Sequence, residues 1–290
     1  MELQRMERPH DGSRKTQPTA SSAGERHEVG DEGSAGPASI AAERLPREAI
    51  LAGVARAREQ GIDRDVRRLL RWAHELLGTR LMMSTAFGKS GMVILHILKD
   101  EAPEVPVFFL DTGFHFPETL DFLARLRKLW NTHLIVRRPK LFGADFTSKY
   151  GEKLYETDPD LCCHKNKVEP FRELIAPDSP YQGWITGIRR DQESTRAQAE
   201  PIELLEGNMV KIQPLAYWTR VDVEKYIDDN DIPLHPLFSQ GYASIGCAPC
   251  TRPSGDSKNE RAGRWAGTLK TECGLHTSWK KAGRGSGKQT

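Results

Sequence analysis

Five cysteines are the residues of this 290-residue chain whose spacing points most directly to chemistry. Four of them form two close pairs, Cys162-Cys163 and Cys247-x-x-Cys250, and Cys273 stands alone. Two local pairs that fold together can supply four thiolates to one metal centre. Adjacent cysteines fit the usual zinc spacing poorly, whereas an iron–sulfur cluster offers several irons. The spacing favours an iron–sulfur site, with zinc, a Cys247/Cys250 redox pair and coincidence as the alternatives.

The fifth cysteine has different surroundings. Cys273 lies in the polar segment Thr271–His276, close to a glycine-rich end of the chain. A buried structural cysteine usually belongs to an apolar element, which this segment is not. A free thiol near His276 and several Lys and Arg residues is a candidate nucleophile, and an incidental cysteine is the alternative.

Two turns follow buried strands at places where open parallel sheets bind ligands. The first is Ser84–Gly91, whose small residues allow backbone N–H groups to approach an anion at a helix N-terminus. The second is Asp111–Pro117. Gly88-Lys89-Ser90 looks like the end of a Walker-type phosphate loop, but the earlier glycine of that motif would fall on Met83. The first turn therefore predicts an anion site of another kind, or an ordinary strand–helix connection.

Hydrophobic periodicity predicts helices and short strands in alternation. Apolar residues recur at helical spacing in two early segments, which Gly61 and Gly78 should end. The expected helices are 46–60, 63–77, the segment around 92–98, 117–130 and 219–230, and the expected buried strands are 81–83, 105–110, 133–136, 184–187 and 209–212. This alternation predicts an α/β fold, with a parallel sheet covered by helices on both faces.

Composition divides the chain into three parts. Residues 1–40 are rich in Ser, Gly, Pro, Glu, Arg and Ala and have almost no large apolar side chains, which is typical of a disordered arm. We expect the folded domain over residues 41–270 and a mobile segment that carries Cys273 over residues 271–290.

The bulk charge and hydropathy exclude several classes of protein. The 42 basic and 40 acidic residues give a net charge of +2, which offers no support for nucleic-acid binding. No apolar run reaches the roughly 18 residues that span a bilayer, and residues 1–40 contain no apolar stretch of a secretory signal. We therefore expect a cytoplasmic protein without a membrane partner, in which structural disulfides are rare.

Together these motifs resemble those of one enzyme family. The cysteine pairs and Glu272-Cys273-Gly274-Leu275-His276 are similar to the signature of the assimilatory adenylyl-sulfate (APS) and phosphoadenylyl-sulfate (PAPS) reductases. The similarity also includes residues 111–113, 186–192, 241–246 and 251–253, and extends over about residues 80–276.

The resemblance implies an adenine-nucleotide α-hydrolase-like fold, thioredoxin or glutaredoxin as electron donor, and sulfite plus a nucleotide as products. It also implies a [4Fe–4S] cluster on the four paired cysteines, Cys162, Cys163, Cys247 and Cys250. By position, the substrate-binding residues of the family fall on Ser84, Gly88, Lys167, Arg196, Arg261, Arg264 and His276. Arg261 and Arg264 would share one face if their segment is helical.

The expected reaction uses Cys273 as its nucleophile. The thiolate attacks the sulfur of the sulfuryl group, the nucleotide phosphate leaves, and an enzyme S-sulfocysteine remains. A thiol of the electron donor then releases sulfite. Basic residues around the site lower the thiol pKa and stabilise the leaving group. We expect the cluster to help position Lys167, four residues after Cys163, without changing oxidation state.

The resemblance leaves the substrate open. Phe87-Gly88 is reminiscent of the PAPS-using branch, whereas the paired cysteines mark the branch that mostly uses APS. A four-thiolate site is harder to acquire by drift than a loop change, so APS is favoured, and a PAPS or dual-substrate reductase is the alternative. Lys89 is the residue that would meet a 3′-phosphate. The oligomeric state is open, a homo-oligomer included.

Two other function classes compete with the reductase. An ATP-pyrophosphatase on the same fold would carry a Ser-Gly-Gly-x-Asp-Ser loop, which the segment 87–91 lacks. A non-catalytic zinc module or redox sensor would use Cys247 and Cys250 alone.

Overall fold

The computed structural model describes residues 43–130, 132–255, 259–276 and 278–279. The arm predicted over residues 1–40 lies outside the described residues. Within them, no helix is both long enough and apolar enough to cross a membrane.

A six-stranded sheet forms the centre of the fold, in the order β3-β2-β1-β4-β6-β5. The strands are β1 (Leu81–Ser84), β2 (Val107–Leu110), β3 (Leu134–Arg137), β4 (Gly183–Ile185), β5 (Ile202–Leu205) and β6 (Met209–Ile212). Every neighbouring pair is parallel except β5 and β6, which are antiparallel. The strand order reverses between β1 and β4, which are adjacent and bracket a switch point where such sheets bind ligands.

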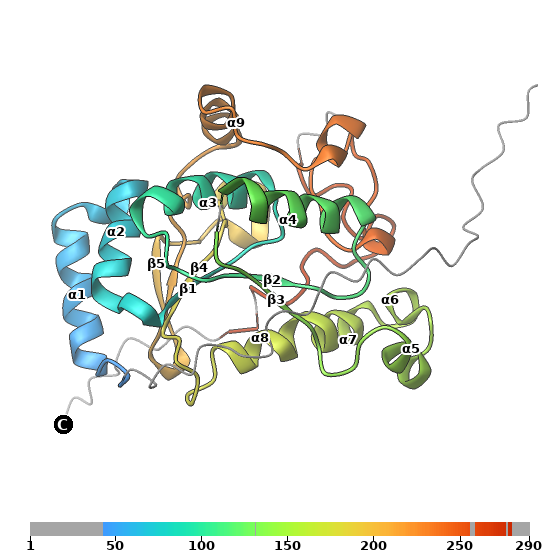
Figure 1. Ribbon diagram of the computed structural model, residues 1–290, viewed down its shortest axis with the longest axis horizontal. Helices are drawn as coiled ribbons and strands as arrows, with labels where there is room; N and C mark the ends of the chain where they lie inside the picture. The colour runs from blue at the N-terminus through green and yellow to red at the C-terminus, as the bar shows by residue number, and fades with distance from the viewer. Residues whose placement is uncertain (1–42, 131, 256–258, 277, 280–290) are drawn as a thin grey trace, which may run out of the picture. The chain divides into compact units, whose positions relative to one another are not determined.

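Helices cover both faces of the sheet (Figure 1). One face carries α2 (Val66–Leu77), α3 (Lys89–Glu101) and α4 (Pro117–Trp130), with α1 (Arg47–Glu59) packed on α2 and α9 (Arg220–Asp229) on α3. The other face carries α8 (Glu169–Leu174), which follows α5 (Ala144–Tyr150), α6 (Leu154–Thr157) and α7 (Pro159–Cys163). This arrangement confirms the predicted α/β fold.

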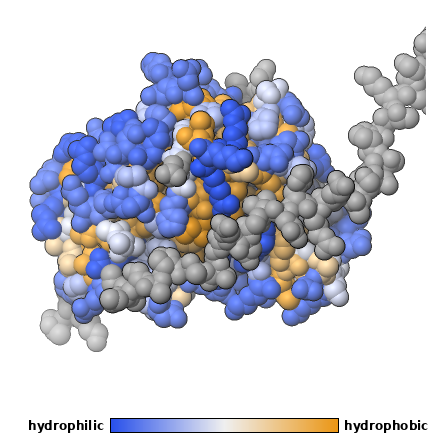
Figure 2. Space-filling model, in the orientation of Figure 1, coloured by the Kyte–Doolittle hydropathy of each residue, from blue (hydrophilic) through white to orange (hydrophobic). Residues whose placement is uncertain are grey.

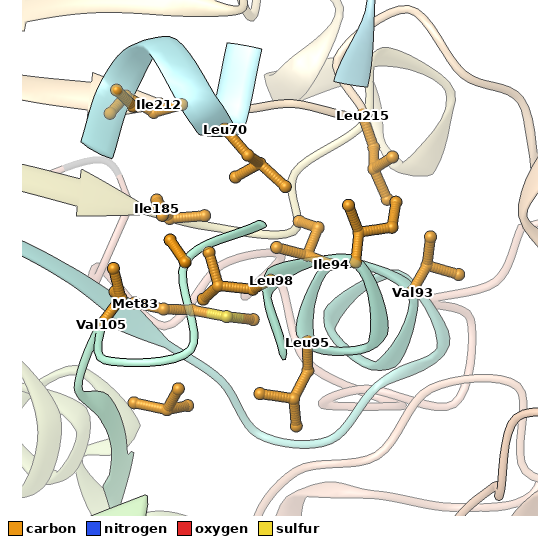
Figure 3. Close-up of a cluster of buried hydrophobic side chains, with 14 of the residues drawn as sticks. Leu70, Met83, Val93, Ile94, Leu95, Leu98, Val105, Ile185, Ile212 and Leu215 are labelled. Carbon is orange, nitrogen blue, oxygen red and sulfur yellow. The ribbon is translucent and has the colours of Figure 1, made fainter. Parts of the chain in front are cut away.

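The larger core lies between the sheet and α2–α4. Figure 3 shows side chains of α3, such as Ile94 and Leu98, packed against Met83 of β1 and Ile185 of β4. All four are buried. Strands covered on both faces have no solvated side, and α3 presents these side chains to the covered face. The outer surfaces of α1, α2 and α9 are mainly hydrophilic (Figure 2). Burial of one stripe of each helix is therefore what holds these elements on the sheet.

Local signals explain most element boundaries. Gly61 and Gly78 follow the first two helices with positive φ angles of 61° and 54°, a conformation that favours glycine. Thr219 caps α9 as predicted: its side chain accepts a hydrogen bond from the backbone N–H of Asp222. Strand β5 was not predicted, although Gly207 and Asn208, both with positive φ, form the kind of turn that joins antiparallel strands.

Candidate functional site

A cavity of about 230 Å³ lies at the switch point between β1 and β4. The turn after β1 and the segment after β4 both line it. These two segments meet at glycines: a Cβ added to Gly187 would lie 3.0 Å from the backbone nitrogen of Gly91. A Cβ on Gly91 would lie 2.5 Å from Oγ1 of Thr85. A larger residue at Gly187 would push the two segments apart, and one at Gly91 would displace Thr85 within the turn after β1.

The turn after β1 presents backbone to the cavity and sends its aromatic side chain away from it. Phe87 has a φ of 58°, is fully buried, and stacks on Phe109 with ring centroids 5.2 Å apart. Gly88 is the N-cap of α3, so the first N–H groups of this 13-residue helix lie at the cavity. The Phe-Gly pair therefore shapes the turn, and the Phe87 ring belongs to the core.

Lys89 is already paired. Its Nζ lies 2.6 Å from Oε1 of Glu224 on α9 and 5.5 Å from the ring centroid of Phe238. Glu224 also accepts a hydrogen bond from Arg220, at 3.0 Å. The ammonium predicted to meet a 3′-phosphate thus has a carboxylate neighbour.

The structure brings the predicted nucleophile and all seven predicted substrate-binding residues to this one cavity. They come from the turn after β1, the turn His164–Val168 after α7, the segment after β4 and the C-terminal part of the chain. The residues are Ser84, Gly88, Lys167, Arg196, Arg261, Arg264, Cys273 and His276. The fold therefore brings together residues that lie up to nearly two hundred positions apart in the sequence.

Some of these residues hold their neighbours in place. Oγ of Ser84 accepts a hydrogen bond of 2.8 Å from Nε1 of Trp184, a fully buried side chain of β4. The imidazole of His276 stacks on the indole of Trp184, with ring centroids 5.3 Å apart and an interplanar angle of 8°. Burial, with Lys211 and Arg196 nearby, lowers the pKa of His276 well below its ordinary value. A neutral His276 therefore packs as a ring and adds no positive charge.

A carboxylate forms ion pairs with two of the predicted anion-binding arginines. Glu272, the residue before the nucleophile, accepts hydrogen bonds from Nε and Nη2 of Arg196 at 2.7 and 3.0 Å. Its Oε2 also accepts one from Nη2 of Arg261, at 3.0 Å. Burial alone would raise the pKa of Glu272, but the two guanidinium groups hold it below its ordinary value. Glu272 is therefore an ionised carboxylate within the cavity wall.

Several buried nitrogens of the cavity have no hydrogen-bond partner among the residues described. They include Nε of Arg261, Nε of Arg264 and Nδ1 of His276. Buried polar groups are almost always paired, so unpaired donors at a cavity indicate an incoming polar ligand. The segment 261–264 is a turn, and Arg264 pairs with Thr251 in an isolated antiparallel bridge. Because the segment is not helical, the condition under which the two arginines would share a helix face is not met, although both side chains line the cavity.

The four paired cysteines line a second, smaller cavity next to the first. Oγ1 of Thr112 lies 3.3 Å from Sγ of Cys247, and Nδ2 of Asn166 lies 3.7 Å from Sγ of Cys162. The turn predicted as a ligand loop at 111–117 therefore contributes mainly here. Lys167 lines both cavities and connects the two sites.

Burial sets the ionisation of these thiols. It raises the pKa of Cys162 to about 12 and that of Cys163 to about 11, and it raises that of Cys250 as well. Cys247 is the exception, because burial is outweighed by Lys167 and its pKa falls below the ordinary value. A metal deprotonates and neutralises such thiols, so this donor set fits a soft metal centre. Among the described residues, no three His, Cys, Asp or Glu side chains converge on a position for a single metal ion.

Lys167 is directed by an irregular stretch of backbone. It lies in a π-helical turn, His164–Val168, that joins α7 to α8 directly after the cysteine pair. Wide turns of this kind inside helices are frequent at functional sites. Burial lowers the pKa of Lys167, whereas the nearby sulfur groups of Cys247, Cys273 and Cys163 raise it, and the net change is upward. The ammonium is therefore charged and stands between the nucleophile and the cysteine cavity.

Sequence reasoning missed three functional neighbours. Glu272 was quoted as part of a motif without a role, and Trp184 was taken only as a strand residue. Arg189 was quoted in a motif too, and it is almost fully buried, with hydrogen bonds to Oγ of Ser90 and to Oε2 of Glu260 at 2.6 and 2.7 Å. A buried arginine needs such partners, but no spacing in the sequence identifies them.

Residues 80–253 match the family described as phosphoadenosine phosphosulfate reductase domain. An adenosine 5′-phosphosulfate reductase of Streptomyces coelicolor is 42% identical over 209 residues, 72% of this chain and 86% of that protein. A phosphoadenosine 5′-phosphosulfate reductase of Gloeobacter violaceus is 42% identical over 212 residues, 72% of this chain and 87% of that protein. The crystal structure of a phosphoadenylyl-sulfate reductase from Candida auris, in a phosphate complex, superposes with a TM-score of 0.61 at 30% identity, over 72% of this chain and 99% of that one.

Proposed function

Because the chain belongs to the phosphoadenosine phosphosulfate reductase family, we propose that it reduces adenosine 5′-phosphosulfate to sulfite and AMP in sulfate assimilation. The observation that carries this proposal is the cavity at the β1–β4 switch point. It combines a half-buried thiol, Cys273, with unpaired buried nitrogens of two arginines and the N-terminus of α3. A nucleophile next to several anion-binding groups suits a substrate with a phosphate and a sulfuryl group.

The proposed chemistry uses the thiolate of Cys273 in two steps. It attacks the sulfuryl sulfur, the bond from that sulfur to the bridging oxygen breaks, and AMP leaves with the electron pair. A thiolate of a dithiol donor then attacks the Cys273 sulfur, and sulfite leaves with the electrons of the S–S bond. The second donor thiol resolves the mixed disulfide, so both electrons come from the donor. We propose thioredoxin, or a glutaredoxin, as this donor.

The cationic groups of the cavity have separate tasks in these steps. Arg261 and Arg264 hold the anionic groups of the substrate, with Lys167 between them and the cysteine cavity. Fixed charges that meet developing charge on a leaving phosphate lower the barrier, because they need no reorganisation. Burial and the neighbouring arginine lower the pKa of Arg261 to about 10, so it stays charged at neutral pH.

We propose a [4Fe–4S] cluster on Cys162, Cys163, Cys247 and Cys250. Four desolvated thiols around one cavity, with Thr112 and Asn166 as hydrogen-bonding neighbours, support it. A cluster spreads its thiolates over several irons, whereas zinc gathers them on one ion. When bound, the cluster would join the end of α7 to the Cys247–Cys250 turn and set the charge beside Lys167. The free state of all five cysteines fits a reducing compartment, and we propose the cytoplasm.

One experiment tests the function. The full chain is purified without oxygen, its iron and sulfide are measured, and sulfite release from APS and PAPS is assayed with thioredoxin. Activity on APS, with a covalent sulfonate adduct on the native protein that the Cys273→Ser variant does not form, is the expected result. Normal turnover by Cys273→Ser would refute the mechanism. A protein with no activity on either substrate would refute the function.

A further inference from the structure

Each of the three nitrogens of one cavity arginine already donates a hydrogen bond within the protein. Nε and Nη2 of Arg196 donate to the two oxygens of Glu272, and Nη1 donates to Oε1 of Gln192 at 2.7 Å. Arg261 and Arg264 differ, because the Nε of each has no partner among the described residues. Arg196 therefore keeps only one N–H on each Nη for a ligand, and its Nε–H is already used by Glu272.

The partner of Arg196 adjoins the nucleophile. The side chains of Glu272 and Arg196 are only 8 and 11% exposed, and their bidentate geometry fixes both distance and orientation. Thr195 adds a hydroxyl 3.3 Å from Oε1 of Glu272. On the other side of Cys273, His276 stacks on Trp184. The thiol therefore lies between two anchors, one ionic and one aromatic.

Further side-chain hydrogen bonds link the Glu272–Arg196 contact to the turn after β1. Gln192 accepts from Arg196 and donates to Oγ of Ser90, at 3.3 Å, in the first turn of α3. The backbone N–H of Arg189 donates to the same Gln192 oxygen, at 3.1 Å. These hydrogen bonds thus tie the segment that carries Cys273 to the segment after β4 and to the N-terminus of α3.

We propose that Glu272 is a positioning residue for the Cys273 thiolate and that Arg196 serves this reaction mainly by holding Glu272, leaving Arg261 and Arg264 to bind the substrate anions. The proposal rests on the proposed function, because it takes the cavity as the site of the sulfate ester. It divides three arginines of one cavity into two roles that different measurements separate.

The first measurement is hydrogen exchange of the peptide that contains residues 271–276, on the iron-loaded full chain without substrate. Glu272→Gln and Arg196→Gln should each raise its exchange about tenfold. The double variant should add little, because Glu272→Gln weakens the contact that Arg196→Gln breaks, together with the contact to Arg261. Glu200→Gln, which removes the carboxylate 2.7 Å from Arg190 outside the cavity, is the matched control and should leave this peptide unchanged. Unchanged exchange in Glu272→Gln would overturn the proposal.

The second measurement separates binding from chemistry. AMP affinity should be retained or increased in Glu272→Gln and Arg196→Gln and should fall at least tenfold in Arg264→Gln. Formation of the Cys273 adduct in a single turnover with APS should slow about tenfold in the first two variants at saturating APS. Loss of AMP affinity in Arg196→Gln as large as in Arg264→Gln would assign Arg196 to the anion and overturn the proposal. Absence of APS chemistry in the native chain would sink the proposed function alone, since exchange and AMP binding test the contact without turnover.

Discussion

Replacing Gly246 by alanine should displace the guanidinium of Arg264 while the fold stays intact. A Cβ at Gly246 would lie 2.4 Å from Cζ of Arg264 and 2.3 and 2.6 Å from its two Nη atoms. Ordinary contact begins at 3.4 Å, so the guanidinium must move by at least about 1 Å. The atoms in the way are the far end of a flexible side chain, so the backbone need not follow.

The size of the effect follows from this displacement. A misplacement of about 1 Å at a reacting site costs on the order of 10²-fold in rate, so kcat/KM for APS should fall about 100-fold, or about 2.7 kcal/mol. Stability should change little, because Gly246 lies outside the left-handed φ region that excludes alanine. The melting temperature should therefore shift by no more than about 2–4 °C.

The assay compares Gly246→Ala, Arg264→Ala and the double variant, each purified without oxygen. Iron per chain is measured alongside, because Gly246 precedes Cys247. If Gly246 acts through Arg264, the double variant is no worse than Arg264→Ala alone. Full activity in Gly246→Ala, or losses that add in the double variant while the iron content stays normal, would refute this reasoning.

Three further predictions concern other contacts of the cavity. Ser84→Ala should lower the free energy of unfolding in denaturant by about 1–3 kcal/mol, because the buried Trp184 N–H loses its acceptor. Glu224→Gln should raise turnover of PAPS relative to APS, because it releases Lys89; an unchanged ratio in paired assays would show that Lys89 does not meet the 3′-phosphate. Because the pKa of His276 is depressed, the unfolded chain binds a proton below about pH 6.5 that the folded chain does not. As the pH is lowered below that value, the free energy of unfolding should decrease by up to about 1.4 kcal/mol per pH unit, and His276→Asn should flatten this slope.

The sheet and its helices followed from short stretches of sequence. The periodicity of residues 117–130 and 209–212 predicted α4 and β6 with their observed ends. Short apolar runs predicted the other parallel strands to within a few residues. Strand β5 was missed, although the Gly207-Asn208 turn was a usable signal for an antiparallel pair with β6. The mobile segment expected over 271–290 stays a prediction, because residues 277 and 280–290 lie outside the described part.

The residues that line the cavity were also singled out from sequence, through motifs whose members lie far apart. Resemblance identified Lys167, Arg196 and Cys273 as members of one site, and the fold brings them to one cavity. It did not separate their tasks. Arg196 was grouped with the anion-binding residues, and only its three internal hydrogen bonds set it apart from Arg264.

The sequence by itself determined the elements, the five thiols and the set of residues that bear chemistry, because side-chain type and periodicity act over a few residues. Only the tertiary structure decided which charge meets which. Glu272 is 76 residues from Arg196, and Glu224 is 135 residues from Lys89. Such pairs depend on how every intervening element packs, and a one-residue shift in any strand would turn its side chains to the opposite face of the sheet. Ion pairing and burial in the cavity are therefore properties of the whole fold.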